Sequence, residues 1–434
     1  MGGGLMQLVA YGAQDIYLTG NPQITFWKVV YRRCTNFAIE SVEQTFMGNA
    51  TPGSRATATI SRNGDLVSNC VLEVNASFLA GAGAFNNNRN TSLFQGGMYN
   101  LVESVEVEIG GQKIDKHYGA WMEIWNELSC PHYGPNDADN STVVSGCGKT
   151  LGHVGIPANI ALGANATKVT TTETFYVPLA FWFNRNPGLA LPLIALQYHE
   201  VKFNFQFSAL SNVISNLTAD ISDVNNNNDA VVNTVKGSTQ AKINSIKMFV
   251  DYIYLDTEER RRFAQQSHEY LIDQIQYTGA VSRTSDTAGS TQSLRLDFNH
   301  PCKELVFVER ILTPNVGLCN FDTNLGNQGG SALLQLNGHD RFAKRPMNYF
   351  TRVQPYQHHT NVPHGDRIGV YSFGLRPEDH QPSGTCNFSR IDNATLQLTF
   401  GANDDGAGSE LQVYATNYNV LRIMSGMGGL AYSN

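Results

Sequence analysis

Residues 101–117 read LVESVEVEIGGQKIDKH. From Val105 to Ile109, apolar residues alternate with glutamates, which is the period of two expected for a strand with one buried face and one wet face. Gly110-Gly111 follows as a two-residue hairpin turn, and residues 112–117 return beside the first strand. The stretch therefore predicts an antiparallel hairpin packed on one side of a core.

The same alternation extends over the first half of the chain. Phenylalanines alternate with polar residues in VKFNFQF at 201–207, and the long helical patterns of a parallel fold do not separate successive strands. We therefore predict an antiparallel, all-β first half of eight strands. The expected strands are Ala38–Phe46, Arg55–Ser61, Leu66–Ala76, Leu101–Ile109, Gln112–His117, Thr172–Phe183, His199–Phe207 and Ile243–Leu255.

The second half repeats this scheme in the same order. Its segment QLNGHDRF, residues 335–342, echoes the strand, turn and strand of EIGGQKI at 108–114. Two consecutive eight-stranded antiparallel jelly rolls, a double jelly roll, are therefore predicted as an internal duplication. The expected strands are Leu271–Thr278, Gln292–Asn299, Glu304–Ile311, Leu333–Leu336, Asp340–Lys344, Val370–Leu375, Ala394–Phe400 and Ser409–Ile423.

The pattern also divides the chain into segments. Residues 1–26 are too apolar for a free tail and are expected to form an N-terminal contact arm. Residues 27–256 form the first predicted jelly roll, and residues 268–434 form the second, with a C-terminal tail. Between them, residues 257–267 are expected to form a linker helix that is capped by Thr257.

Three long connections interrupt the first half. They are rich in Asn, Gly, Ser and Thr and cover residues 77–100, 118–171 and 208–242. Such segments are typical of surface loops. Because they alternate with tight turns along an up-and-down path, we expect them at one pole of the first barrel.

Composition excludes several classes of function. The chain has 434 residues, 15% of them charged, and a net charge of −7. The net negative charge argues against general binding of nucleic acid. No apolar stretch approaches the roughly 20 residues of a membrane span. The chain starts without the features of a secretory signal, so we expect it outside the secretory pathway. Its scattered cysteines predict reduced thiols rather than a disulfide framework or a zinc site.

Two glycine-rich motifs resemble nucleotide-binding signatures. GCGKT at 146–150 matches the end of a phosphate-binding loop, but the first required glycine falls on Val143. GMGGLA at 426–431 mimics a dinucleotide fingerprint, but no helix follows to carry the phosphate. We therefore expect no nucleotide cofactor, and we expect the second motif to form a flexible tail.

A histidine-rich segment is the remaining candidate metal site. His358, His359, His364 and Asp366 lie in a Pro-rich and polar stretch without regular ligand spacing, which favours a solvated loop. Elsewhere, acidic residues accompany neither a Ser-His nor a Cys-His constellation. The sequence therefore predicts no catalytic residue, metal site or cofactor, and the protein is not expected to be an enzyme.

Five segments carry a resemblance to a known family. They are residues 7–26 (QLVAYGAQDIYLTGNPQITF), 60–65 (ISRNGD), 187–194 (PGLALPLI), 384–393 (GTCNFSRIDN) and 417–426 (NYNVLRIMSG). These segments resemble the major capsid protein of large double-stranded DNA viruses of algae, of the chlorella-virus type. The match runs nearly from end to end of the chain.

The resemblance implies a double jelly roll with a structural function. It implies a homotrimeric capsomer of pseudo-hexagonal outline that contacts neighbouring capsomers and minor capsid proteins in an icosahedral shell. An internal virion membrane would lie nearby without being spanned, and nucleic acid would not be bound directly. The protein would reside in the virion after assembly in the host cytoplasm. Independently of the resemblance, the loop sequons at Asn90, Asn140 and Asn165 are the candidate sites for virus-encoded glycosylation.

One alternative function belongs to a different class. Many β-sandwich proteins bind or cleave carbohydrate, and they need a concave groove with facing carboxylates or aromatic rings. The sequence cannot place carboxylates from different strands together. A carbohydrate-binding or carbohydrate-cleaving β-sandwich protein therefore stays open at this point.

Overall fold

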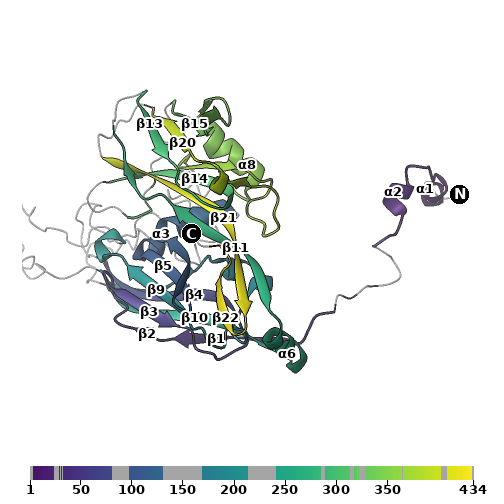
Figure 1. Cartoon of the computed structure of the whole chain (residues 1–434), viewed down its shortest axis with the longest axis horizontal. Coiled ribbons are helices and arrows are strands. Elements are labelled where there is room, and N and C mark those ends of the chain that lie inside the picture. Colours follow the sequence, from purple (N-terminus) through teal and green to yellow (C-terminus); the bar gives the residue numbers. More distant parts are fainter. Residues whose placement is uncertain are drawn as a thin grey trace, which may run out of the picture. The chain divides into compact units, whose positions relative to one another are not determined.

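The computed structural model describes residues 3–23, 29, 31, 33–80, 97–130, 169–213, 241–284, 289–312, 317–319, 321, 329–363, 365–401 and 408–432. The chain divides into two compact units, Met1–Phe37 and Ala38–Asn434 (Figure 1). In the first unit, the short helices α1 (Gly3–Val9) and α2 (Ile16–Thr19) contain no buried residue. The second unit contains two β-barrels.

Two sheets form the first barrel. One has the strand order β1-β10-β4-β7 with β8 paired to β4, and the other has the order β2-β3-β9-β5-β6. In β9 the side chains are buried at every second position, so that the three phenylalanines of VKFNFQF face the core. The strands are β1 Phe37–Gln44, β2 Phe46–Met47, β3 Arg55–Thr59, β4 Leu66–Ala80, β5 Val102–Ile109, β6 Gln112–Tyr118, β7 Val169–Pro178, β8 Leu191–Pro192, β9 Val201–Phe207 and β10 Ala241–Leu255.

The second barrel repeats the strand order of the first. Its sheets have the orders β11-β21-β14-β18 and β13-β20-β15-β16, with β12 and β22 paired to β21, β19 to β14, and β17 to β15. The strands are β11 His268–Tyr277, β12 Val281–Ser282, β13 Thr291–Arg295, β14 Pro301–Ile311, β15 Ser331–Leu336, β16 His339–Asp340, β17 Arg345–Pro346, β18 Ile368–Ser372, β19 Cys386–Asn387, β20 Ala394–Thr399, β21 Ser409–Met424 and β22 Met427–Leu430. The predicted double jelly roll is confirmed.

Equivalent hairpins support the duplication. Gly110 and Gly111 have φ angles of +59° and +86°, and Asn337 and Gly338 have φ angles of +50° and +78°. Two successive positive φ angles are the requirement of a type I′ turn, which glycine and asparagine meet with little strain. Both predicted two-residue turns are therefore present, between β5 and β6 and between β15 and β16.

The sheet β11-β21-β14-β18 is shared by two cores. Leu305 and Phe307 of β14 pack into the core of the second barrel, whereas Val306 and Val308 belong to the cluster that fills the first barrel. Tyr414 of β21 also faces the first barrel and lies 5.5 Å from Trp121, measured between ring centroids. A sheet covered on both faces explains the continuous apolar run from Leu305 to Val308.

Helical segments are short and lie between strands. They are α3 Gly119–Ser129, α5 Trp182–Arg185, α6 Thr257–Gln265, α8 Gln354–His358, the 3-10 turns η1 Gly97–Leu101, η2 Pro187–Leu189, η3 Leu210–Asn212 and η6 Phe388–Arg390, and the π-helical turn η5 Tyr349–Val353. The predicted helix after residue 256 is confirmed as α6. Its cap is Asp256 rather than Thr257, because the Asp256 carboxylate accepts a hydrogen bond of 2.8 Å from the Thr257 amide.

Two helices replace predicted loop or strand. The expected loop of residues 118–171 begins with α3, in which nine of the eleven residues are buried. A helix buried all round lacks the one-sided stripe that marks a surface helix. The expected strand Thr172–Phe183 ends at Pro178, and Trp182–Arg185 turns as α5. A short apolar run fits a buried strand and a buried helix equally well.

Two further predictions are wrong near chain reversals. The expected strand Asp340–Lys344 is limited to Asp340, because the chain bends after β16 so that β17 can pair with the other end of β15. The expected flexible tail at 426–431 contains β22, which pairs with β21 from Leu421–Leu430 to Met424–Met427. Its Gly428 donates its amide proton to His199 Nδ1 at 3.1 Å, so the C-terminal hairpin contacts the first barrel.

A substitution at Gly428 tests how closely the C-terminal hairpin packs on the first barrel. A Cβ at this position would lie 2.7 Å from Leu196 Cδ2 and 3.3 Å from Ile109 Cγ2, both core atoms of the first barrel. We expect Gly428→Val to lower the free energy of unfolding by about 1–3 kcal/mol through overpacking. Gly408→Val is the control, because no atom of the described residues lies within 4 Å of its Cβ position. Equal thermal stability of the two variants would contradict the docked hairpin.

Candidate functional site: the seam between the barrels

Charged side chains of both barrels meet at a buried seam. Asp273 of β11 and Lys303 of β14 form an ion pair of 3.1 Å, and Arg185 Nη1 of α5 approaches the same carboxylate oxygen at 3.8 Å. The Arg185 guanidinium also lies 4.2 Å from the ring centroid of Trp125 in α3. Burial lowers the pKa of Arg185 from its ordinary value. Asp273 thus places a negative charge between two cations that desolvation would otherwise disfavour.

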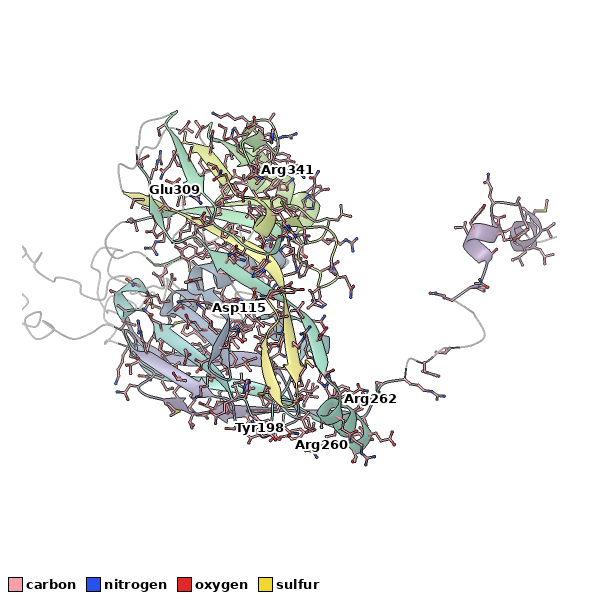
Figure 2. All side chains as sticks on the ribbon, in the orientation of Figure 1. Asp115, Tyr198, Arg260, Arg262, Glu309 and Arg341 are labelled. Carbon is pink, nitrogen blue, oxygen red and sulfur yellow. The ribbon has the colours of Figure 1, made fainter. Side chains whose placement is uncertain are left out.

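Strand β6 joins the first barrel to β11 by polar contacts. Asp115 accepts a hydrogen bond of 3.1 Å from the Ile275 amide, and the Gln274 side chain donates to the Ile114 carbonyl oxygen. Asp115 also pairs with His117 Nε2 at 2.9 Å. Figure 2 shows Asp115 at the level where the two barrels meet. These contacts fix the position of β11 along β6.

The C-terminal end of α3 is held by the second barrel. The Asn361 amide donates to the Leu128 carbonyl oxygen at 3.0 Å, and its side chain donates to the Glu127 carbonyl oxygen at 2.7 Å. Arg367 pairs with the Glu127 carboxylate at 3.3 Å. Carbonyls in the last turn of a helix lack intrahelical partners. The second barrel therefore completes a helix of the first.

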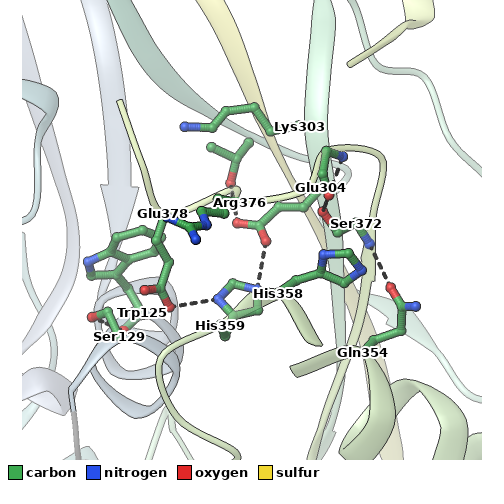
Figure 3. Close-up of polar contacts among 12 residues, drawn as sticks. Trp125, Ser129, Lys303, Glu304, Gln354, His358, His359, Ser372, Arg376 and Glu378 are labelled. Carbon is green, nitrogen blue, oxygen red and sulfur yellow. Dashed lines mark hydrogen bonds and ion pairs between the residues drawn. The ribbon is translucent and has the colours of Figure 1, made fainter. Parts of the chain in front are cut away.

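His359 is the centre of a second buried cluster. Its Nε2 lies 2.9 Å from a Glu304 carboxylate oxygen and its Nδ1 lies 2.9 Å from a Glu378 oxygen. Figure 3 shows the imidazole between the two carboxylates. Carboxylates accept hydrogen bonds, so a ring that carries protons on both nitrogens has an acceptor on each side. The arrangement therefore suits a buried imidazolium.

The electrostatics of the cluster agree with this charge state. Burial opposes a charged ring, but Glu304 and Glu378 outweigh it and raise the pKa of His359 to about 9. For Glu304, burial alone would raise the pKa, whereas His359, Lys303 and Thr416 together hold it below its ordinary value. The cluster is an ionic lock in which each buried charge has a partner of opposite sign.

The lock connects three segments of the second barrel. Glu304 lies on β14, His359 follows α8, and Glu378 lies in the segment after β18. Glu378 also accepts a hydrogen bond of 3.0 Å from the Thr360 amide, and the His358 ring lies 3.0 Å from the Leu375 carbonyl oxygen. Because Asn361 comes two residues after His359, the lock continues into the contact with α3.

The arrangement serves structure rather than chemistry. In the part of the chain that the structure describes, no group of three or more His, Cys, Asp or Glu side chains is placed to hold a metal ion. Over the same residues, no helix is both long enough and apolar enough to cross a bilayer. The pairs of Arg185 with Asp273 and of Arg367 with Glu127 join the two barrels, so the seam fixes the barrels to each other.

The predicted site residues have different outcomes. Asn90, Asn140 and Asn165 lie outside the described residues, as do residues 146–150 and His364. The solvated-loop interpretation is wrong for His359, whose side chain is fully buried. Asp366, from the same interpretation, accepts a hydrogen bond of 2.7 Å from Arg352 Nε.

Sequence reasoning missed the seam because its partners are distant in the chain. Arg185 and Asp273 are 88 positions apart by their numbers, and Glu304 and His359 are 55 apart. The one local signal is the pair Lys303-Glu304, two charges that open the apolar run of β14. A charge at the start of a strand covered on both faces needs a buried partner.

The lock predicts a loss of stability at high pH. Folding raises the pKa of His359 from 6.5 to about 9, so its stabilisation is complete below the lower value and is lost as the pH rises through the higher one. At pH 7 we expect His359→Gln to lower the free energy of unfolding by about 3–5 kcal/mol, because it leaves Glu304 buried without its cationic partner His359. Urea unfolding at pH 7 and pH 10 measures both effects.

The control is His339→Gln, at an exposed residue of β16. It should keep the stability of the unmodified chain at both pH values. His359→Gln should lose less stability between pH 7 and pH 10 than the unmodified chain, because the titrating group is gone. The same pH-dependent loss in both proteins would contradict the imidazolium lock.

Comparison with known proteins places the chain in a family. The family model described as "Major capsid protein N-terminus" matches residues 25–256. A second model, "Large eukaryotic DNA virus major capsid protein", matches residues 259–429. The two matches meet at α6, between the two barrels.

Individual relatives agree along the whole chain. The major capsid protein of Pyramimonas orientalis virus is 48% identical, with both chains covered completely. That of Paramecium bursaria Chlorella virus 1 is 43% identical, again with complete coverage of both. A chain of the solved quasi-atomic model of the PBCV-1 virus capsid has a TM-score of 0.69 and 38% identity, over 94% of this chain and all of that chain. These relatives are structural proteins rather than enzymes, and the chain belongs to the major capsid proteins of large eukaryotic DNA viruses.

Proposed function

We propose that three copies of the chain form a homotrimeric capsomer of pseudo-hexagonal outline, and that these capsomers tile an icosahedral shell. The observation that carries this proposal is the repeated strand order, β1-β10-β4-β7 in one barrel and β11-β21-β14-β18 in the other. Three chains with two similar barrels each place six barrels around one axis. A closed ring of this kind follows the point-group symmetry of most oligomers.

The seam supports this function because a tile must keep its shape. A hinge between the barrels would let the outline of the capsomer vary. The shared sheet and the ion pairs across the seam oppose a hinge between the barrels, since moving one barrel would expose Val306 and separate Arg185 from Asp273. A fixed angle between barrels is what repeated packing in a shell requires.

An exposed apolar edge supports association between copies. Strand β1 lies at the end of its sheet, and Phe37 and Ile39 on it are 53% and 58% exposed. Unprotected edge strands with apolar side chains invite pairing with another chain. We propose that a second copy covers this edge in the capsomer.

The N-terminal segment is proposed as an assembly contact. Residues 1–26 contain the apolar residues Leu8, Tyr17 and Leu18, which are 80%, 89% and 83% exposed in their own unit. Apolar side chains at this density are unfavourable in water unless a partner covers them. The proposed partners are neighbouring capsomers and minor capsid proteins under the shell.

Other features of the proposal follow from the family. The domain division is 1–26, 27–256, 257–267 and 268–434, and the family-model bounds at 256 and 259 support the position of the linker. We propose assembly in the host cytoplasm, with an internal virion membrane nearby and no direct contact with nucleic acid. Glycans are proposed at Asn90, Asn140 and Asn165. The carbohydrate-active alternative is not favoured by any relative reported above.

The trimer is expected to be obligate. Permanent interfaces bury on the order of 2,000 Å² or more. Size-exclusion chromatography with light scattering should therefore give a mass of about three times 47.7 kDa that persists on dilution. Ile39→Asp should weaken the trimer at least tenfold, while Ile39→Val should not. A folded monomer that appears on dilution of the unmodified chain would contradict the proposal.

The arm is expected to act after trimer formation. Deleting Met1–Gln14 should leave the trimer intact and reduce the yield of assembled particles severalfold. A second variant, with Leu5, Leu8 and Val9 changed to Ser, keeps the length of the arm and should show the same defect if the contact is apolar. Particle yield measured by sedimentation decides this, and normal yield from the truncated chain would refute the role of the arm.

A further inference from the structure

Two cysteines of the second barrel lie opposite each other on neighbouring strands. Cys302 of β14 and Cys386 of β19 are direct partners in an antiparallel register. Residues opposite each other in such a pair have Cα atoms about 4.5–5.5 Å apart, and their side chains point to the same face of the sheet. A disulfide requires Cα atoms about 4.4–6.8 Å apart. The two positions therefore meet the backbone requirement for a disulfide.

The surrounding contacts place both thiols in one core. Cys302 belongs to the buried cluster of the second barrel, and Cys386 packs against that cluster. The register of β14 against β21 shifts between Cys302 and Glu304. This bulge brings Cys302 onto the face that Leu305 and Phe307 present to the same core. Both cysteines are free thiols in the structure, so two reduced sulfur groups share one face of adjacent strands.

Closure of a bond between them requires only a small local movement. Opposed residues have Cβ atoms about 4.5–5.5 Å apart, compared with about 3.8 Å in a disulfide. Strand β19 can supply this movement because it has only two residues and, in the described part of the chain, pairs with β14 alone. Strand β14 is held between β21 and β18. The movement therefore brings Cys386 toward Cys302.

The two thiols differ in access and in their charge environment. Cys302 is completely buried, whereas Cys386 is partly exposed. Burial raises the pKa of both thiols, but the positive charge of Arg341 acts against this rise at Cys386. The thiolate is the reactive form of cysteine. Cys386 is therefore the thiol that an external oxidant reaches first, and Cys302 is placed to react second.

We propose that Cys302 and Cys386 form a redox pair that closes to a disulfide, with a small-molecule disulfide such as oxidised glutathione as the oxidant. The Cys386 thiolate attacks one sulfur of that molecule, so that a mixed disulfide forms and one glutathione leaves as a thiolate. The Cys302 thiolate then attacks the Cys386 sulfur and displaces the second glutathione. Two cysteine thiols are oxidised to one disulfide, and one oxidised glutathione is reduced to two thiols, which take up the two protons that the cysteines release.

The bond constrains the part of the second barrel that contains the ionic lock. The loop that it closes, residues 302–386, includes β15, β18, His359 and Glu378. Closing a long loop removes conformational entropy from the unfolded chain. Thiols stay reduced in the cytosol, and disulfides persist in oxidising surroundings. The disulfide therefore stabilises the second barrel once the chain leaves a reducing compartment. This chemistry is independent of the proposed trimer, so either can fail without the other.

Oxidation of the full chain tests the pair. The protein is incubated with oxidised glutathione, the remaining thiols are blocked with N-ethylmaleimide in denaturant, and its peptides are analysed by mass spectrometry without reduction. We expect a cross-linked peptide that joins Cys302 to Cys386 and is two hydrogen atoms lighter than the separate peptides. The midpoint of thermal unfolding should rise by several degrees and return to its initial value with dithiothreitol. Blocking of both thiols by N-ethylmaleimide, or an unchanged midpoint in the linked protein, would overturn the proposal.

Variants separate the two chemical steps. Cys302→Ala lacks the second thiol, so glutathione should accumulate on Cys386 as a mixed disulfide. Cys386→Ala should lose the rise in the unfolding midpoint, and it tests the pair even if the buried Cys302→Ala does not fold. Cys34→Ala, at an exposed cysteine of the N-terminal unit, is the matched control and should keep the cross-link and the rise. Circular dichroism shows whether each variant is folded. A rise that persists in folded Cys386→Ala would refute the pair.

Discussion

Burial of the sheet β11-β21-β14-β18 on both faces is the constraint on which the rest of the structure depends. Alternate residues of β14 serve different cores, with Phe307 in the second barrel and Val306 against the first. Apolar burial contributes about 25 cal/mol per Å² of surface removed from water. Separating the barrels would lose this contribution along the whole sheet. Residues 38–434 are accordingly one compact unit, although the sequence family divides them near residue 257.

The charges at the seam contribute less to net stability than the apolar contact does, and their effect is to select one arrangement of the two barrels. A buried ion pair gains little net stability, because desolvation offsets most of the attraction. Breaking the pair lowers the free energy of unfolding strongly, however, because one charge is then left buried and uncompensated. Arg185 with Asp273 and Arg367 with Glu127 each need one residue from either half. An altered angle between the barrels would unpair them, so these pairs select one arrangement from those that bury similar apolar area.

The alternation of apolar and polar residues made most strands predictable. It gave no signal for elements that are buried on all sides, or for side chains whose partners are far away in the sequence. Strands such as β5 and β9 have one core face, so their alternation is visible in the sequence. Helix α3 is buried nearly all round, so it has no polar stripe to reveal its period. His359 resembled a loop residue because Glu304, which determines its charge state, lies 55 positions away. The family resemblance identified the fold, but it did not identify the seam.

Because the two barrels belong to one chain, the contact between them can include buried charged side chains. Two separate barrels would have to desolvate any charge at their contact each time they associated, and each would lose translational and rotational freedom. Within one chain, the second barrel docks at a high effective concentration set by the linker α6. A seam that pairs Arg185 with Asp273 and Arg367 with Glu127 is therefore formed once, during folding. The association steps that build a shell then need only surfaces between chains, which can stay free of buried charge.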